Sequence, residues 1–297
     1  MARAQMTRVT ETTSPLSLAP TAVIAGNGVL PKLLAQELAF HGPPPTIAAI
    51  EGEAGDWINA YPSFAIKSVE IGVLVAELKK RGVSRLVLAG GVKNRPKISS
   101  LRFDWVTIKS LPQFAKALRQ GDDALLKTFI AVLEAHGFAV VGAHEIMPDL
   151  LASQGAMTTL KPNAQDRLDL SCAMQAAREL GRLDIGQGAV AVGGRVVAVE
   201  GAEGTDAMLF RVTEMRKSGR ISANKKGVLV KMAKPGQDMR ADLPSIGPDT
   251  IDHVAAAGLA GIAVSADCSL ILNFAETIKR ANVNKIFITG FDVGSET

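Results

Sequence analysis

Short apolar runs alternate with amphipathic stretches in the first half of the chain. The runs at residues 21–25, 46–50 and 85–91 predict buried strands, and the stretches between them show helical periodicity. Residues 121–137 predict a longer amphipathic helix, and a fourth strand is expected at 138–145. This alternation favours an α/β domain built on a Rossmann-like, parallel sheet.

The pattern changes after residue 146. Residues 147–165 show little periodicity and predict a linker, whereas the apolar runs around Gly193 and Gly194 predict a β-hairpin with a primed turn. A hairpin is foreign to an all-parallel sheet, so we expect a second domain of mixed α/β topology. The expected organisation is a disordered leader (1–20), an N-terminal α/β domain (21–146), the linker and a C-terminal mixed α/β domain (166–297).

Composition narrows the class of protein. Apolar residues make up 47% of the 297 residues, which excludes a disordered chain, and a net charge of +4 falls short of a nucleic-acid footprint. We therefore expect no nucleic-acid partner, although the charge suits an anionic ligand. No apolar run reaches the roughly 18 residues of a membrane span, and the first twenty residues do not form a secretory signal. Cys172 and Cys268 have no partner spacing and indicate buried thiols in a reducing cytoplasm.

A glycine turn follows the first predicted strand. Gly26, Asn27 and Gly28 resemble the start of a dinucleotide fingerprint, because glycines let the backbone approach a phosphate at a helix N-terminus. Pro31 stands where the third glycine of that fingerprint would be, so the support for a nicotinamide cofactor is weak. A plain strand-to-helix turn and a site for another phosphate or a sugar are the alternatives.

Polar residues also follow the third and fourth predicted strands, at the edge where parallel sheets bind ligands. Lys93 and Arg95, beside Gly91, either hold an anion or are solvated loop charges. His144 next to Glu145 suits an acid or base, and a hydrogen-bonded structural pair explains the two residues equally well.

Carboxylates gather at two predicted helix starts. Asp122 and Asp123 open the helix of residues 121–137, where capping is favoured over substrate contact. A second group contains three carboxylates within seven residues, which fits part of an oxygen-ligand site for Mg²⁺. For Asp206, a stabilising charge in the first turn of a helix is the alternative. The members of this second group are Glu200, Glu203, Thr205 and Asp206.

The segment 231–250 is charged, is interrupted by prolines and lies between apolar elements. It carries Lys231, Lys234, Gln237, Arg240 and Asp242. Cations that neutralise phosphoryl oxygens, beside a carboxylate that holds a metal or orients water, are typical of phosphate-transfer sites. A solvated surface loop is the alternative, and the two prolines argue against it.

Several of these motifs occur together in one family. "GNGVLP", "GDDALL", "GAHE", "GRLDIGQGAVAV", "EGTDAML", "DLPSIG" and "AGLAGI" follow one another in order between residues 22 and 291. In these motifs the chain resembles the UDP-2,3-diacylglucosamine pyrophosphatases of the LpxI type. The resemblance implies two α/β domains with the ligand between them. It also implies a cytoplasmic, Mg²⁺-dependent hydrolase of lipid A biosynthesis that associates with the inner-membrane surface and forms UMP and 2,3-diacylglucosamine 1-phosphate.

The resemblance also suggests roles for individual residues. The aspartate of the family's R-x-D-L-P motif falls on Asp242, which we expect to be essential for catalysis. The chain departs from the family pattern after the third strand, where it has Gly90 and Gly91, so the detail of substrate contact there is open. We expect Asp242, Asp206 and Glu200 to hold Mg²⁺, and the substrate to contact Gly26, Asn27, Gly28, Gly91, Lys93, Asp122, Asp123, His144, Gln187, Thr205, Lys234, Gln237 and Arg240.

Two other functions stay open on the sequence. One is a non-catalytic protein that binds the lipid product or a nucleotide sugar, and the other is a nicotinamide-dependent oxidoreductase. No amphipathic helix stands out, so membrane contact is expected only because the substrate is a lipid. A homodimer is left open as well.

Overall fold

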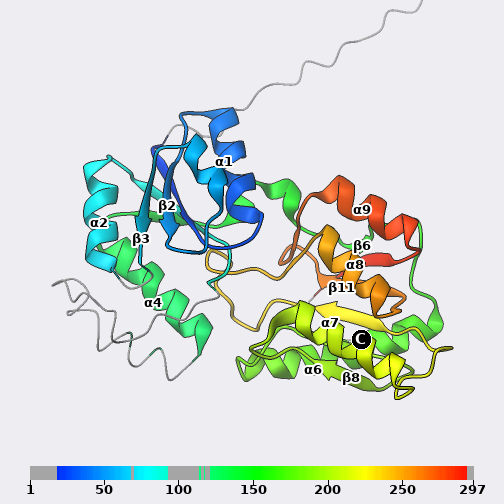
Figure 1. Ribbon diagram of the computed structural model, residues 1–297. Coiled ribbons are helices and arrows are strands. Elements are labelled where there is room, and N and C mark those ends of the chain that lie inside the picture. Colours follow the sequence, from blue (N-terminus) through cyan, green and yellow to red (C-terminus); the bar gives the residue numbers. More distant parts are fainter. Residues whose placement is uncertain (1–18, 68–69, 93–113, 115–116, 118–120, 293–297) are drawn as a thin grey trace, which may run out of the picture.

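Two sheets organise the part of the chain that the structure describes. The computed structural model describes residues 19–67, 70–92, 114, 117 and 121–292, so the expected leader lies almost wholly outside the described residues. Figure 1 shows an N-terminal lobe, coloured blue to green, beside a C-terminal lobe, coloured green to red. The predicted α/β fold class is confirmed.

The N-terminal sheet has five parallel strands in the order β3-β2-β1-β4-β5. β1 lies between β2 and β4 and pairs with both, so the strand order reverses at β1. Ligands of such sheets bind at the carboxyl ends of the strands beside this reversal. The sequence did not predict β3. The strands are β1 (Thr21–Ala25), β2 (Thr46–Ile50), β3 (Ser63–Ile66), β4 (Arg85–Ala89) and β5 (Ala139–Val141).

Helices cover both faces of this sheet because successive strand residues point to opposite sides. Leu86 of β4 packs with Leu74 and Leu133 on one face, and its neighbour Val87 packs with Leu34 on the other. Burying each such side chain contributes about 1.5–3 kcal/mol. The helices are α1 (Leu30–His41), α2 (Ile71–Lys80), α4 (Asp122–Ala135) and α5 (Ala143–Ile146), with short 3-10 helices η2 (Asp56–Ala60) and η4 (Pro148–Leu150).

The C-terminal sheet is mixed and has the strand order β6-β13-β11-β9-β7-β8. The predicted hairpin is present: β7 and β8 are antiparallel, and Gly193 and Gly194 have φ of 64° and 79° in the turn between them. β9, β11 and β13 run parallel, whereas β7 is antiparallel to β9. The strands are β6 (Gly155–Ala156), β7 (Gly188–Ala191), β8 (Val196–Val199), β9 (Val228–Lys231), β11 (Gly261–Ser265) and β13 (Phe287–Phe291), and β10 (Ser245–Ile246) pairs with β12 (Leu270–Ile271) in a separate small sheet.

Alternation along the strands again separates two cores. Leu229 of β9 packs among residues of α7, α8 and α9, whereas its neighbour Val230 packs against α6. The helices are α6 (Ala164–Arg182), α7 (Gly204–Lys217), α8 (Pro248–Ala256) and α9 (Phe274–Val283).

One long loop of the C-terminal lobe packs into the N-terminal lobe. This loop, residues 232–244 between β9 and β10, is called the β9–β10 loop below. Its Ala241 packs against the core that contains Leu86, and its Leu243 belongs to the core that contains Leu34. The segment expected as a linker also carries regular structure, since β6 pairs with β13.

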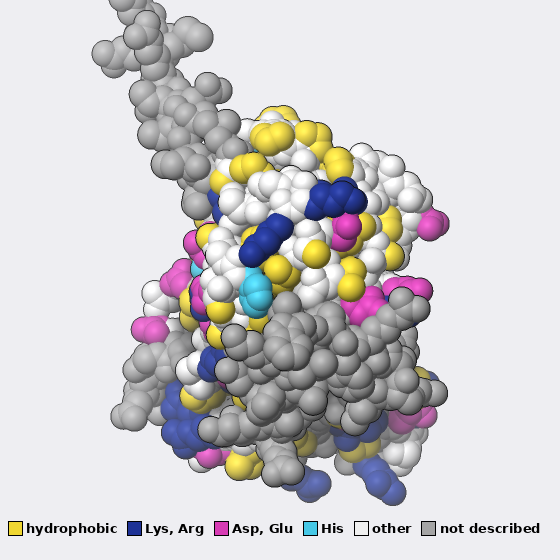
Figure 2. All heavy atoms as spheres, turned by 90° about the vertical axis from the view of Figure 1, so that its left-hand side faces the viewer, with side chains coloured by type: hydrophobic (Ala, Val, Ile, Leu, Met, Phe, Trp, Pro, Cys, Tyr) yellow, Lys and Arg dark blue, Asp and Glu magenta, His cyan; other side chains and the backbone are white. Residues whose placement is uncertain are grey.

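No helix in the described ranges is long and apolar enough to cross a membrane. Figure 2 views the molecule from the side of the N-terminal lobe. Over the upper, coloured part of this face, apolar side chains lie among neutral ones and charged side chains are few. The net charge of +4 is therefore not gathered on that part of the surface.

Candidate active site

A cluster of five charged residues lies where the two lobes meet. Lys231 ends β9, Lys234 and Asp242 belong to the β9–β10 loop, and Glu200 directly follows β8. Asp123 comes from the N-terminal lobe, in the first turn of α4. Four of the five lie at or beyond the carboxyl ends of their strands, which is the usual ligand edge of α/β sheets.

Asp242 is the centre of this cluster. Burial among protein atoms is the main cause that raises the pKa of Asp242. The ammonium groups of Lys231 and Lys234 oppose that shift in pKa. The carboxylates of Glu200 and Asp123 add to it. All four groups therefore act on Asp242 electrostatically.

The surroundings of Asp242 combine contact with water and enclosure by protein. Its surface is exposed to solvent, yet burial raises its pKa. The two observations agree for a carboxylate in a cleft, which touches water on one side while protein fills most of the space around it. Such a position suits a group that acts on a bound ligand.

Gln237 fixes the shape of the β9–β10 loop. Its side-chain amide donates to the main-chain carbonyl of Asp242 at 2.6 Å, and its Oε1 accepts from the main-chain N–H of Lys234 at 2.8 Å. The Gln237 side chain thus links Lys234 and Asp242, the two loop residues that belong to the cluster. We predicted substrate contact for Gln237, and the structure shows a role in the loop itself.

Lys231 is a buried cation, only 7% exposed. It is the last residue of a strand whose four positions are all buried, and its Nζ donates to the main-chain carbonyl of Ser245 at 3.1 Å. A buried ammonium group is unfavourable without an opposite charge. Asp242 supplies that charge nearby, and an anionic ligand would supply more.

Glu200 is a buried carboxylate with one free oxygen. Its Oε1 accepts a hydrogen bond from Thr205 Oγ1 at 2.7 Å. Among the described residues, Oε2 of Glu200 and Oε1 of Gln187 are buried and have no hydrogen-bond partner. Unsatisfied buried oxygens are rare and indicate a missing ligand or water.

The structure does not bring Asp206 to this cluster. Oδ1 of its exposed carboxylate lies 3.0 Å from Nδ1 of His253, within hydrogen-bond and ion-pair distance. Consecutive helix residues point about 100° apart, so Asp206 and Thr205 in the first turn of α7 face different directions. Asp206 was expected as a metal ligand, and its position argues against that role. Thr205 is not the cap of the helix, whose N-cap residue is Glu203, and its hydroxyl donates to Glu200.

Asp184 is a functional candidate for which the sequence predicted no role. It adopts a left-handed backbone conformation with φ 53°, and its side chain forms an ion pair with Lys234. Its Oδ2 also accepts from the main-chain N–H of Asp123 at 3.4 Å, so it caps α4 from the other lobe. A side chain at Gly121, the N-cap residue of α4, would collide with this carboxylate. The only sequence signal was its place in the motif "GRLDIGQGAV".

Arg240 is occupied by protein carboxylates. Its guanidinium donates to both oxygens of Asp238, at 3.0 and 2.8 Å, and to Glu134 of α4 at 2.6 Å. The hydrogen bond with Arg240 lowers the pKa of Asp238, and the same bond raises the pKa of Arg240. Arg240 therefore fastens the β9–β10 loop to the N-terminal lobe. The sequence had predicted that it contacts substrate.

The glycine turns of the N-terminal lobe pack against each other. Asn27 and Gly91 form a two-way backbone bridge, with N–H to carbonyl distances of 2.8 and 3.0 Å. A Cβ at Gly26 would lie 2.5 Å from the carbonyl oxygen of Gly91, so a side chain is excluded there by the close approach of two backbones. Gly28, in contrast, is exposed and has open space around it.

His144 lies near the β9–β10 loop. It belongs to α5, directly after β5, and its buried Nδ1 has no partner among the described residues. A Cβ at the preceding Gly142 would lie 3.2 Å from the carbonyl oxygen of Met239 in the β9–β10 loop. Lys93 and the side chain of Asp122, both expected to contact substrate, lie outside the described residues.

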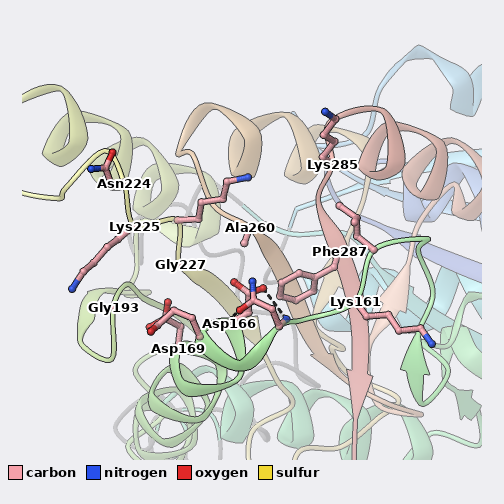
Figure 3. Close-up of a pocket in the computed structure, with 14 residues that line it drawn as sticks. Lys161, Asp166, Asp169, Gly193, Asn224, Lys225, Gly227, Ala260, Lys285 and Phe287 are labelled. Atoms are coloured by element: carbon pink, nitrogen blue, oxygen red, sulfur yellow. Dashed lines mark hydrogen bonds between the residues drawn. The ribbon is translucent and has the colours of Figure 1, made fainter.

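A cavity of about 430 Å³ lies elsewhere in the C-terminal lobe (Figure 3). It opens at the amino ends of β9, β11 and β13, and no predicted site residue lines it. Its two carboxylates already have partners: Asp166 accepts from the N–H of Asn163 at 3.0 Å, and Asp169 from that of Gly194 at 2.5 Å. In Figure 3 the labelled Lys161 and Lys285 extend away from those carboxylates.

The donor set of the charged cluster suits Mg²⁺. In the described part of the chain, no three His, Cys, Asp or Glu side chains form a complete metal-binding group. Mg²⁺ needs fewer protein ligands, because it commonly binds one or two carboxylates and takes the rest of its oxygens from waters and substrate phosphates. Asp242 and Glu200, the latter with a free buried oxygen, meet this requirement.

Comparison with known proteins agrees with the motifs. Family models described as the LpxI N-terminal domain and the LpxI C-terminal domain match residues 20–150 and 153–289. The chain is 39% identical over 271 residues to the UDP-2,3-diacylglucosamine pyrophosphatase LpxI of Caulobacter vibrioides, an alignment that covers 91% of this chain and 96% of the relative. On these matches the chain belongs to the LpxI family of UDP-2,3-diacylglucosamine pyrophosphatases.

Proposed function

We propose that the chain acts in lipid A biosynthesis and hydrolyses the pyrophosphate of UDP-2,3-diacylglucosamine to UMP and 2,3-diacylglucosamine 1-phosphate. The observation that carries the proposal is the placement of Asp242 between two lysines and a second carboxylate at the meeting of the lobes. The relative from Caulobacter vibrioides carries the name of this activity.

Lys231 and Lys234 bind phosphoryl oxygens of the substrate and offset their charge, which grows as the bridging P–O bond breaks. A water oxygen forms the new P–O bond, and the departing phosphate keeps the bridging oxygen. Asp242 and Glu200 would hold Mg²⁺, whose chemistry when bound is to neutralise phosphoryl oxygens and to make water a better nucleophile. Gln237 holds the main chain of Lys234 close to that of Asp242 through its two hydrogen bonds.

The glycine turns after β1 and β4 would hold the sugar-phosphate part of the substrate, and an apolar groove between the lobes would take the acyl chains. The resemblance to the family favours a cytoplasmic enzyme, and a lipid substrate would bring it to the inner-membrane surface. The domain limits of 21–146 and 166–297, like the homodimer, stay predictions.

The test is to incubate the pure protein with UDP-2,3-diacylglucosamine, with and without EDTA, and to measure UMP. We expect UMP only when Mg²⁺ is present. Asp242→Ala should abolish its release, and the control Asp149→Asn, at an exposed carboxylate outside the cluster, should not. Binding of the lipid without release of UMP would indicate a carrier and would refute the proposal.

A further inference from the structure

Glu200 and Lys231 lie on neighbouring parts of the C-terminal sheet, separated by one strand. The main-chain N–H of Glu200 donates to the carbonyl of Gly188 at 2.8 Å, and Gly188 pairs with Lys231 in the register of β7 and β9. Residues that pair directly across strands point to the same face of a sheet. The side chains of Glu200 and Lys231 therefore share a face, with Gly188 between them.

Gly188 leaves the space that the Glu200 carboxylate occupies. A Cβ at Gly188 would lie 2.6 Å from Oε2 of Glu200, closer than real Cβ contacts come. Gly188 is buried and does not have a positive φ, so the reason for a glycine here is space rather than backbone conformation. Any side chain at this position would push the carboxylate away from the strand.

Thr205 fixes the other oxygen of the same carboxylate. Its hydroxyl donates a hydrogen bond to Oε1 of Glu200 at 2.7 Å. The N-cap residue of α7, Glu203, provides no side-chain cap either. Thr205 thus holds Oε1, whereas the buried Oε2 has no hydrogen-bond partner in the part of the chain that the structure describes.

We propose that Thr205 and Gly188 position Glu200 so that its free Oε2 is the second acidic ligand of a divalent cation, beside Asp242. This inference deepens the proposed function and rests on it. Thr205 is then a positioning residue that does not touch the substrate, in contrast to the substrate contact expected from the sequence. Partners that orient a metal ligand in this way commonly change metal affinity by about 10–100-fold when they are removed.

The test compares Thr205→Val with Thr205→Ser, because valine keeps the shape and removes the hydroxyl, whereas serine keeps the hydroxyl. Mn²⁺ replaces Mg²⁺, and the electron paramagnetic resonance signal of free Mn²⁺ gives the dissociation constant without substrate. Thr213→Val is the matched control, since Thr213 lies in the same helix and donates only to the carbonyl of Leu209. We expect Thr205→Val to weaken Mn²⁺ binding by about 10-fold or more, and Thr205→Ser and Thr213→Val to stay within about threefold of the unaltered protein.

Steady-state kinetics add a second readout. At saturating metal, Thr205→Val should leave the KM for UDP-2,3-diacylglucosamine unchanged, because Thr205 makes no substrate contact. Unchanged Mn²⁺ affinity in Thr205→Val, or a loss in Thr205→Ser as large as that in Thr205→Val, would overturn the inference. So would a raised KM at unchanged metal affinity.

Gly188→Ala tests the same carboxylate from the other side. Its methyl group should displace Oε2 and weaken Mn²⁺ binding by about tenfold, with circular dichroism reporting whether the variant folds. If it does not fold, the threonine series still decides. If the unaltered protein releases UMP in EDTA and binds no Mn²⁺, the metal-dependent proposed function itself fails, which is distinct from a failure confined to the variants.

Discussion

The ion pair between Asp184 and Lys234 should couple folding to catalysis. The two side chains are only 18% and 16% exposed, so solvent screens them far less than a surface pair. Exposed pairs contribute about 0.2–1 kcal/mol, and removing one partner of a fully buried pair costs about 3–5 kcal/mol. For this largely but not fully buried pair we expect Asp184→Asn and Lys234→Met each to lower the free energy of unfolding by about 2 kcal/mol, with a coupling energy of roughly 1–2 kcal/mol in the double variant.

The assay is a double-mutant cycle measured by urea unfolding and by kcat/KM. Lys234 acts on Asp242, so Asp184→Asn should also lower kcat/KM, by about tenfold for each 1.4 kcal/mol of lost transition-state stabilisation. The pair of Arg182 and Glu179 is a matched control, because its atoms are as close as 2.6 Å but its side chains are 58% and 56% exposed. Its coupling energy should stay below about 0.5 kcal/mol.

Salt separates the two pairs further. At about 0.5 M NaCl the exposed pair should lose most of its coupling energy, whereas the Asp184–Lys234 pair should keep most of it. Additive single changes at Asp184 and Lys234, within about 0.3 kcal/mol, would refute the reasoning.

Three further predictions concern other parts of the structure. Arg240 lowers the pKa of Asp238, so this carboxylate stabilises the fold fully above its unfolded pKa of about 3.9 and progressively less as the pH falls through its lower folded pKa. In urea unfolding, Asp238→Asn should therefore lose less stability on the acid side than the unaltered protein, and an unchanged pH profile would count against the pairing. Arg216 donates to the carbonyls of Ala257, Ser222, Lys225, Lys226 and Gly258, so Arg216→Lys, which cannot span them, should lower the free energy of unfolding by about 2–3 kcal/mol, and a loss under about 0.5 kcal/mol would contradict this. Gly90→Ala should destabilise the protein clearly more than Gly28→Ala, because both glycines have positive φ but only at Gly90 would a Cβ collide with the backbone of Asn27; equal melting temperatures would show that the close approach does not matter.

Secondary structure that depends on residues close together in the sequence was predictable. The β7–β8 hairpin was expected because Gly193 and Gly194 favour a primed turn wherever they stand between apolar runs. The parallel N-terminal sheet followed from the alternation of strands and helices. β3 and β6 were missed, since short strands acquire their structure by pairing with β2 and β13 rather than from a pattern of their own.

The same distinction holds for the candidate site. Lys231, Lys234 and Asp242 lie within one short segment, so their joint chemistry was visible in the sequence. The role of Arg240 was not, because Glu134, one of its two partners, is 106 residues away. No role was predicted for Asp184 for a similar reason, since its partner Lys234 is fifty residues distant. Charge and spacing identify which residues are reactive, but long-range pairing decides which of them are already engaged by the protein.

Because the β9–β10 loop packs into the cores of the N-terminal lobe, neither lobe can be removed or exchanged without affecting the other. A C-terminal fragment would retain its own sheet, including the strand that carries Lys231, but Ala241 and Leu243 on either side of Asp242 would lose their packing. An N-terminal lobe exchanged for another of the same fold would have to reproduce the two pockets that hold these side chains. Substitutions at core positions such as Leu34 and Leu86 would therefore also affect the position of Asp242, in the other half of the chain.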